Sequence, residues 1–219
     1  MKQKIKVWDL PTRIFHWTLV SAVAFMWYSG QTGGNLLAWH LRCGLLILAL
    51  VVFRVCWGLW GSDTAKFRQF VRGPKQIIRY LKGEITENEQ PGHNPLGALM
   101  VLALLGAVLV QVTTGLFSPD DNTFIYNGYL NSLVSSDTAA VMRKIHFGFF
   151  NLLLILAAVH IITILAYKIL KKHNLITPMI TGRKELEGRL PLLKFAGSGK
   201  FISALAVAVI VVAIVANIG

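Results

Sequence analysis

Residues 145–170 read IHFGFFNLLLILAAVHIITILAYKIL and contain one charged side chain, Lys168. A helix needs about 20 consecutive apolar residues to cross a bilayer. The run lacks the alternation of apolar and polar residues that marks a strand of a membrane barrel, so its backbone can be satisfied in lipid only as an α-helix. The stretch therefore predicts a membrane-spanning helix that carries two histidines, His146 and His160.

Similar apolar runs occur four more times along the 219 residues, at about 14–30, 36–60, 96–117 and 201–218. Hydrophobic residues make up 54% of the chain and charged residues only 15%, a composition that a soluble domain does not need. We therefore expect an all-α integral membrane protein, with a four-helix bundle followed by a fifth, C-terminal transmembrane helix.

The net charge of +12 is concentrated in three segments, residues 2–13, 66–82 and 168–200. Lys and Arg accumulate in the cytoplasmic loops of membrane proteins. This rule places the N-terminus in the cytoplasm and, with five spans, the C-terminus on the opposite side. Because the rule already accounts for the positive charge, the sequence indicates contact with membrane lipids and no nucleic-acid partner.

Within the second basic segment, residues 74–82 (PKQIIRYLK) place Ile77, Ile78 and Leu81 opposite the Lys and Arg side chains. This pattern is typical of a short amphipathic helix that lies on the membrane surface. An ordinary solvated connector fits the same composition equally well.

Four of the six histidines lie inside or at the ends of the apolar runs: His16, His40, His146 and His160. Ionisable residues within a membrane span are costly and therefore indicate function. Any one of them alone fits a hydrogen-bonded structural role equally well, so the interpretation depends on their arrangement.

His146 and His160 are 14 residues apart, about four turns, so they share one helix face at depths about 21 Å apart. With the predicted topology, His16 lies at the depth of His160 near the cytoplasmic side, and His40 lies at the depth of His146 near the outer side. Each pair of imidazoles suits one b-type haem held from both faces without covalent attachment, whereas zinc would need four ligands converging on one point. The sequence thus predicts two bis-histidine haem b groups.

Further residues of the apolar runs suit a cofactor. Arg54 follows His40 by 14 positions, which places it at the depth of the haem predicted between His16 and His160. There a haem propionate would neutralise the charge of the guanidinium. An Arg54 side chain that extends to the inner lipid headgroups fits equally well. Gly44, one turn after His40, would let a porphyrin approach the backbone. Gly97 and Gly115 share a face of the third run, for which close helix packing is an equally good explanation.

The order of several motifs supports a family resemblance. The chain resembles the bacterial membrane-bound di-haem cytochromes b of the cytochrome b561 type, which include the b subunits of nickel-iron hydrogenases. About the first 180 residues carry the resemblance, in the histidine pair of residues 145–170 and in WDLPTRIFHW (8–17), WHLRCG (39–44), FRVCWGLWGS (53–62), GHNPLGA (92–98) and QVTTGLF (111–117). It implies that the four histidines are axial haem ligands and that the protein lies in the bacterial inner membrane, where the charge rule places its C-terminus in the periplasm. The fifth run departs from the family's usual four-helix core, so we expect a di-haem domain (1–175) followed by a linker and an extra helix (176–219).

A bis-histidine iron has no open coordination position, so the haems are expected to pass single electrons. The resemblance implies an electron-transfer subunit, with quinone oxidoreductase activity, that links the quinone pool to a periplasmic redox partner such as a multihaem cytochrome c, a hydrogenase or a molybdenum enzyme. The polar segment 118–141 is the largest predicted outer loop and therefore the expected docking place.

Two alternatives remain open. A stand-alone oxidoreductase that passes electrons from superoxide to ubiquinone, as in a close branch of the family, would use basic residues near the outer haem, and Arg42, Arg143 and Lys144 lie close in sequence to His40 or His146. The same charges would dock an acidic cytochrome equally well. A transporter would show broken helices or an internal repeat, and neither is evident.

The motif GHNPLG (92–97) opens the third run on the predicted inner side and is the expected quinone site. His93 would exchange a proton with a quinone oxygen and Asn94 would donate a hydrogen bond, next to the free amides of a helix N-terminus. The same motif also predicts a simple helix start, with Asn94 as the N-cap and Pro95 as the first helical residue.

Overall fold

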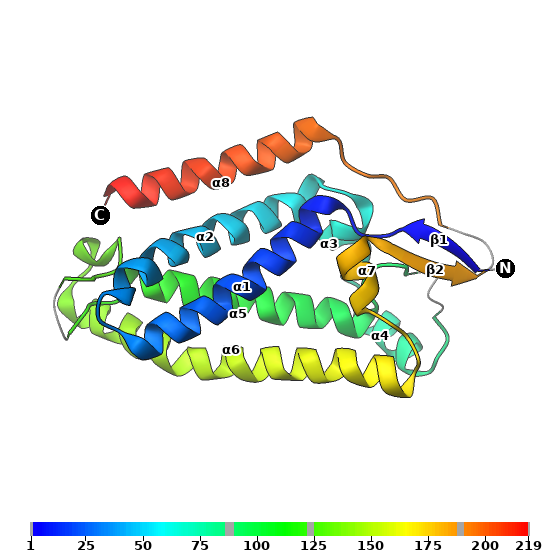
Figure 1. Cartoon of the computed structure of the whole chain (residues 1–219), viewed down its shortest axis with the longest axis horizontal. Coiled ribbons are helices and arrows are strands. Elements are labelled where there is room, and N and C mark those ends of the chain that lie inside the picture. Colours follow the sequence, from blue (N-terminus) through cyan, green and yellow to red (C-terminus); the bar gives the residue numbers. More distant parts are fainter. Residues whose placement is uncertain (1, 86–89, 122–124, 188–190, 219) are drawn as a thin grey trace. The chain divides into compact units, whose positions relative to one another are not determined.

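The computed structural model describes residues 2–85, 90–121, 125–187 and 191–218 (Figure 1). Long helices dominate; short helices and strand β2 lie between them in the described chain, and strand β1 precedes the first of them. The elements are, in order, β1 (Lys2–Lys6), α1 (Leu10–Thr32), α2 (Leu36–Trp60), η1 (Asp63–Ala65), α3 (Phe67–Phe70), α4 (Pro74–Leu81), α5 (Pro95–Phe117), η2 (Asn131–Leu133), α6 (Ser136–Leu170), α7 (Ile176–Thr181), β2 (Arg183–Glu187) and α8 (Ser198–Ile218).

Each predicted apolar run forms a helix, and α2 has the predicted bounds. The largest difference is in α6, which begins at Ser136 although the apolar run begins at 145. Ser135 explains the earlier start, because its Oγ accepts a hydrogen bond from Thr138 N (3.3 Å) and its carbonyl accepts one from Ala139 N (2.9 Å). A helix end satisfied in this way lets the helix include residues 136–144, which precede the apolar run.

Four of the described helices are long and apolar enough to span a membrane: α2, α5, α6 and α8. The prediction of a helical integral membrane protein is therefore confirmed. α1 has 23 residues but is not among these four. The total of five spans stays a prediction, as does the cytoplasmic position of the N-terminus.

The chain divides into two compact units, each built from three segments. Unit 1 comprises Met1–Phe15, Arg54–Ala103 and Leu156–Ser203; unit 2 comprises His16–Phe53, Leu104–Ile155 and Ala204–Gly219. His40 and His146 belong to unit 2, whereas Arg54 and the motif at residues 92–97 belong to unit 1.

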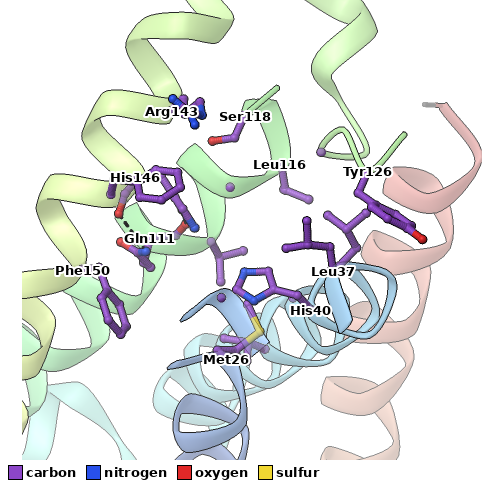
Figure 2. A pocket seen from close by; sticks show the side chains of 18 of the residues that line it. Met26, Leu37, His40, Gln111, Leu116, Ser118, Tyr126, Arg143, His146 and Phe150 are labelled. Atoms are coloured by element: carbon purple, nitrogen blue, oxygen red, sulfur yellow. Dashed lines mark hydrogen bonds between the residues drawn. The ribbon is translucent and has the colours of Figure 1, made fainter. Parts of the chain in front are cut away.

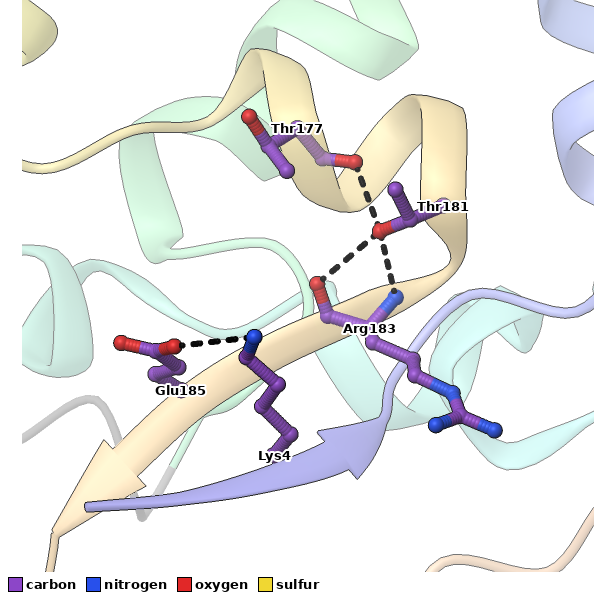
Figure 3. A network of polar contacts seen from close by, with 5 residues as sticks. All are labelled: Lys4, Thr177, Thr181, Arg183 and Glu185. Carbon is purple, nitrogen blue, oxygen red and sulfur yellow. Dashed lines mark hydrogen bonds and ion pairs between the residues drawn. The ribbon is translucent and has the colours of Figure 1, made fainter.

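Unit 1 contains a small sheet that the sequence did not predict. β1 and β2 pair antiparallel, with Lys4 opposite Glu185, and Lys4 Nζ lies 3.5 Å from Glu185 Oε1 (Figure 3). At the end of α7, Thr181 Oγ1 donates to the carbonyl of Thr177 (2.9 Å) and accepts from Arg183 N (3.2 Å), which leads the chain into β2. In the sequence these strands are only short stretches of charged residues. They could not be predicted as strands, because each pairs with a segment about 180 residues away.

A buried aspartate fixes the beginning of α1 in unit 1. Asp9 Oδ1 accepts a hydrogen bond from Thr12 N (2.8 Å), the pattern of an N-cap. Asp9 Oδ2 accepts a second one from Nε1 of the buried Trp57 (3.0 Å). The carboxylate therefore joins α1 to α2, and this explains why the helix begins directly after Asp9, within the stretch WDLPT (8–12).

A clasp in unit 1, defined here as Ser62 and Asp63 with residues 194–196, holds the segment that leads to α8. Asp63 N donates to the carbonyl of Lys194 (3.0 Å), and Lys194 N donates to Asp63 Oδ2 (2.9 Å). Ala196 N donates to Ser62 Oγ (3.0 Å). The hydrogen bond from Lys66 to Asp63 and that from Lys194 N lower the pKa of the Asp63 carboxyl below its ordinary value.

The predicted amphipathic helix is also confirmed as a helix, α4, although its contact with a membrane surface stays a prediction. Ile78 and Leu81 are 51% and 65% exposed. Tyr80 ties α4 to the rest of unit 1, because its hydroxyl lies 2.5 Å from the Tyr167 hydroxyl and accepts a hydrogen bond from Asn94 Nδ2 (2.9 Å).

Candidate cofactor-binding site

Unit 2 encloses a cavity of about 740 Å³. Its wall is formed by α1, α2, α5 and α6 and by residues from the segments 118–121 and 126–129 (Figure 2). The volume lies in the range of about 300–1,000 Å³ that is usual for cofactor and ligand pockets. Most of the lining is apolar, and His40 and His146 both belong to it.

A tight turn between α1 and α2 builds one side of this cavity. Gly33 and Gly34 have φ values of 65° and 58°, a left-handed conformation that glycine adopts without strain. The turn ends α1, where Gly33 N donates to the carbonyl of Ser29 (3.0 Å), and starts α2, where Leu36 N donates to the carbonyl of Gly33 (3.2 Å). As a result, the end of α1 lies next to the first turns of α2.

The turn brings Ser29 against His40. The Oγ atom of Ser29 lies 3.0 Å from Nδ1 of His40 and also donates to the carbonyl of Met26 (3.3 Å). Because the serine hydrogen points to Met26, the serine oxygen accepts a hydrogen bond from Nδ1. This arrangement favours the tautomer of His40 that has its lone pair on Nε2, the form in which an imidazole can bind a metal.

His146 is oriented by α5 in a similar way. Its Nδ1 lies 2.9 Å from the backbone carbonyl of Gln111, which can only accept a hydrogen bond. The side-chain amide of Gln111 donates in return to the carbonyl of His146 (3.0 Å; Figure 2). The lone pair of His146 is therefore also on Nε2.

The distance between the two rings fits a pair of axial ligands. The ring centroids of His40 and His146 are 6.3 Å apart, with an angle of 77° between the ring planes. A metal-bound imidazole nitrogen lies about 2 Å from the metal and about 1 Å from its ring centroid, so two imidazoles on opposite sides of one metal have centroids about 6 Å apart. The two residues thus fit the predicted haem ligation.

Glycines give both imidazoles room. A Cβ atom on Gly30 would lie 3.4 Å from Cε1 of His40, and one on Gly115 would lie 2.9 Å from Cε1 of His146. The predicted role of Gly44 is compatible with the structure, since this residue lines the cavity and a Cβ there would meet only Met26 Cε, at 4.0 Å.

The second predicted pair is divided between the units. His16 lies in unit 2 beside Trp17, with ring centroids 5.0 Å apart, and His160 lies in unit 1. Both are half-buried residues of long helices. Their pairing stays a prediction.

Arg54 is buried in unit 1, with only 3% of its surface exposed. Its guanidinium carbon lies 4.9 Å from the ring centroid of Phe67 and 5.9 Å from that of Phe70. Among the described residues, its Nη1 atom has no hydrogen-bond partner. A buried guanidinium with an unsatisfied nitrogen suits an anionic group such as a propionate better than snorkelling to the headgroups, the alternative left open by the sequence.

The two residues of the predicted quinone site have different surroundings within unit 1. His93 packs between Trp8 and Phe70, with ring centroids 4.7 Å away in each case. Asn94 caps α5, because its Oδ1 accepts a hydrogen bond from Gly97 N (2.7 Å), and Pro95 is the first residue of α5 as predicted. The amide nitrogen of Asn94 donates to the Tyr80 hydroxyl, so both ends of this side chain are engaged.

The basic residues near the histidines in sequence differ in position. Arg143 lines the cavity, whereas Arg42 and Lys144 are not among its lining residues. The guanidinium of Arg42 lies instead over the ring of Trp39, at 4.9 Å from its centroid. The cavity therefore has one of the three predicted cations in its wall.

Sequence reasoning missed several residues of the site. Ser29 and Gln111, which set the histidine tautomers, were not predicted. Gln111 could have been predicted to make a contact between helices, because it is an amide inside a largely apolar run, where polar side chains form hydrogen bonds across helices. Ser29 was harder to predict, since its position next to His40 depends on the turn at Gly33 and Gly34.

A family model described as prokaryotic cytochrome b561 matches residues 7–182. No curated protein and no solved structure matches the chain significantly. The matched region contains all four histidines of the predicted haem ligation.

Proposed function

The chain belongs to the prokaryotic cytochrome b561 family, and from this membership we infer that it is a di-haem cytochrome that carries electrons between the quinone pool and a periplasmic redox partner. Family membership itself makes the chain a membrane b-type cytochrome of electron transfer, with haem b as its cofactor. The number of haems, their ligands and both redox partners are our proposal.

One observation carries the proposal: the facing imidazoles of His40 and His146 in the cavity of unit 2. Haem b supplies an iron that changes oxidation state by one electron. His40 and His146 would bind this iron from both sides, and Ser29 and Gln111 hold the rings in the required tautomer. With both imidazoles on the iron, no protein-free position would be left for oxygen or substrate, and the haem would supply single-electron transfer.

We assign the second haem to His16 and His160. α6 contains both His146 and His160 in one uninterrupted helix, which agrees with two binding levels on one helix. Arg54 would bind a propionate of this second haem, because it is buried and its Nη1 atom has no hydrogen-bond partner among the described residues.

The direction of the chain in the membrane follows from charge. Lys and Arg gather in residues 2–13, 66–82 and 168–200, which supports a cytoplasmic N-terminus and five spans in a bacterial inner membrane. We assign residues 1–175 to the di-haem domain and 176–219 to a linker and an extra helix, and the family match, which ends at residue 182, supports this division.

The quinone would bind at the N-terminus of α5 in unit 1. The hydroxyls of Tyr80 and Tyr167 lie 2.5 Å apart and beside Asn94, so they are better placed than the Asn94 amide to bind a quinone oxygen. His93 directly precedes Asn94 in the chain, and its imidazole would exchange a proton with a quinone oxygen.

The lining of the cavity favours a protein partner over a small anionic donor. A site that attracts superoxide needs a net positive lining. The charged residues in the described wall are Arg143, Asp120 and Asp121. With two carboxylates and one guanidinium, the wall has no net positive charge that would draw a small anion in from solution, so we propose a multihaem cytochrome c, a hydrogenase or a similar protein as the external partner.

Haem counting on the detergent-purified protein tests the proposal. We expect two haem b per chain with low-spin spectra, one per chain in His40→Ala and in His146→Ala, and two in His173→Ala, which changes an exposed histidine outside the apolar runs. Equal loss of both haems in His40→Ala and His146→Ala, with His173→Ala unaffected, would contradict the pairing. Absence of haem from the wild-type protein would contradict the function.

A further inference from the structure

The charged residues in the described wall of the cavity in unit 2 are Arg143, Asp120 and Asp121, and Arg143 pairs with Asp121. Most of the other wall residues are apolar. Figure 2 shows Arg143 and Ser118 together on one side of His146, with Phe150 and Met26 on the other side. A cofactor with one charged edge and one apolar edge can therefore enter in only one favourable orientation.

Arg143 is the cation in the described part of the cavity wall. It precedes His146 by three residues in α6, so the two side chains share a helix face. Its guanidinium carbon lies 4.9 Å from the ring centroid of Phe147, and this contact restricts the side chain. Arg143 is thus placed one helical turn from a proposed iron ligand.

The present partner of Arg143 is a carboxylate. Its Nη1 atom lies 3.1 Å from Oδ2 of Asp121, and the two side chains are 33% and 53% exposed. An ion pair this exposed is weak. A guanidinium can bind two carboxylates, and it prefers bidentate contact with one.

From this geometry we infer that Arg143 binds the propionate carboxylates of the haem held by His40 and His146, and that Asp121 competes with them for the same guanidinium. The inference rests on the proposed function, since it requires haem in the cavity of unit 2. Arg143 acts here as a positioning residue that orients the haem and offsets the negative charge of its propionates.

The two charges should shift the midpoint potential of this haem in opposite directions. A positive charge near the iron destabilises the ferric form relative to the ferrous form, because the ferric form carries one more positive charge. Arg143→Gln should therefore lower the potential of the haem held by His40 and His146. Asp121→Asn should raise it, and neither variant should move the other haem.

The test is a potentiometric titration of detergent-purified Arg143→Gln, Asp121→Asn and Lys144→Gln, with haem content measured in each. Lys144→Gln is the matched control, because it removes one positive charge from an exposed neighbour outside the cavity wall. Opposite shifts in the first two variants and none in the control are expected. Equal shifts in Arg143→Gln and Lys144→Gln, or shifts of the same sign in Arg143→Gln and Asp121→Asn, overturn the inference.

A second measurement applies if the Arg143→Gln variant loses haem during purification, and it compares the rates at which the proteins release haem. The transfer of haem to a globin that scavenges it should be about tenfold to a hundredfold faster than in the wild type, and Arg143→Lys should recover part of this difference. Equal transfer rates in wild type and Arg143→Gln overturn the inference, while the haem counts of the histidine variants still decide the proposed function separately.

Discussion

Gly115 in α5 gives the most direct test of the proposed ligand geometry. A Cβ atom there would lie 2.9 Å from Cε1 and 3.2 Å from Nδ1 of His146, while ordinary contacts begin at 3.4 Å. In Gly115→Ala the imidazole must therefore move by about 0.5 Å, the difference between 3.4 and 2.9 Å. Such a movement weakens the hydrogen bond between Nδ1 and the carbonyl of Gln111, now 2.9 Å long.

The size of the effect follows from this hydrogen bond. Losing a buried hydrogen bond costs about 1–3 kcal/mol, which corresponds to about 5-fold to 150-fold weaker haem binding. We expect Gly115→Ala to bind one haem firmly and to lose the other on dilution. The assay is the haemochrome spectrum before and after dilution of the purified protein.

Gly106→Ala is the matched control, because Gly106 also lies in α5 and its Cβ would have no described atom within 4 Å. This variant should keep both haems and gain about 1 kcal/mol of helix stability, the usual difference between alanine and glycine. Equal haem retention in the two variants would refute the placement of His146 against α5.

Three further predictions concern other parts of the chain. Ser29→Ala removes the hydrogen-bond acceptor of His40 Nδ1. It should weaken binding of the haem held by His40 and His146 by about 10-fold to 100-fold, measured by haem loss on dilution. Arg54→Met should lower the midpoint potential of the haem assigned to His16 and His160 and leave the other unchanged; two unchanged potentials would mean that the guanidinium does not reach a propionate. Asp63→Asn should lower the thermal stability at neutral pH, since the pKa of Asp63 in the folded chain lies below its ordinary 3.8 and the charged form is therefore the stabilising one. The difference from the wild type should be complete above pH 3.8 and disappear as the pH falls below the folded pKa, and a difference that is constant with pH would contradict this role.

The long helices and the histidine pair of unit 2 could be predicted because both depend on local pattern. An apolar run of about 20 residues leaves only one spanning structure, so the bounds of α2 follow directly from the run at 36–60. The pairing of His40 with His146 follows from helix direction and depth, which need only the order of the helices. Their separation of 6.3 Å between ring centroids agrees with that prediction.

The missed features lie outside the pattern of apolar runs. β1 and β2 are short charged stretches whose strand character appears only when they pair. Ser135 extends α6 through a cap that lies outside the apolar run. Asn94 was predicted both as a cap and as a quinone ligand; its hydrogen bond with Gly97 confirms the cap, whereas its contact with Tyr80, 14 residues earlier, could not be predicted from the local pattern.

The clasp of unit 1 has a consequence for the order of assembly. Ser62 and Asp63 leave the ribosome more than 120 residues before Lys194 and Ala196, with which they form three hydrogen bonds. Until then water must satisfy Asp63 Oδ2 and the amide of Asp63, while Lys66 can already donate to Asp63 Oδ1. The clasp closes only after the four histidines of the proposed haem sites have been synthesised, so closure of this clasp is a late event in biogenesis and α8 is the last helix to be anchored.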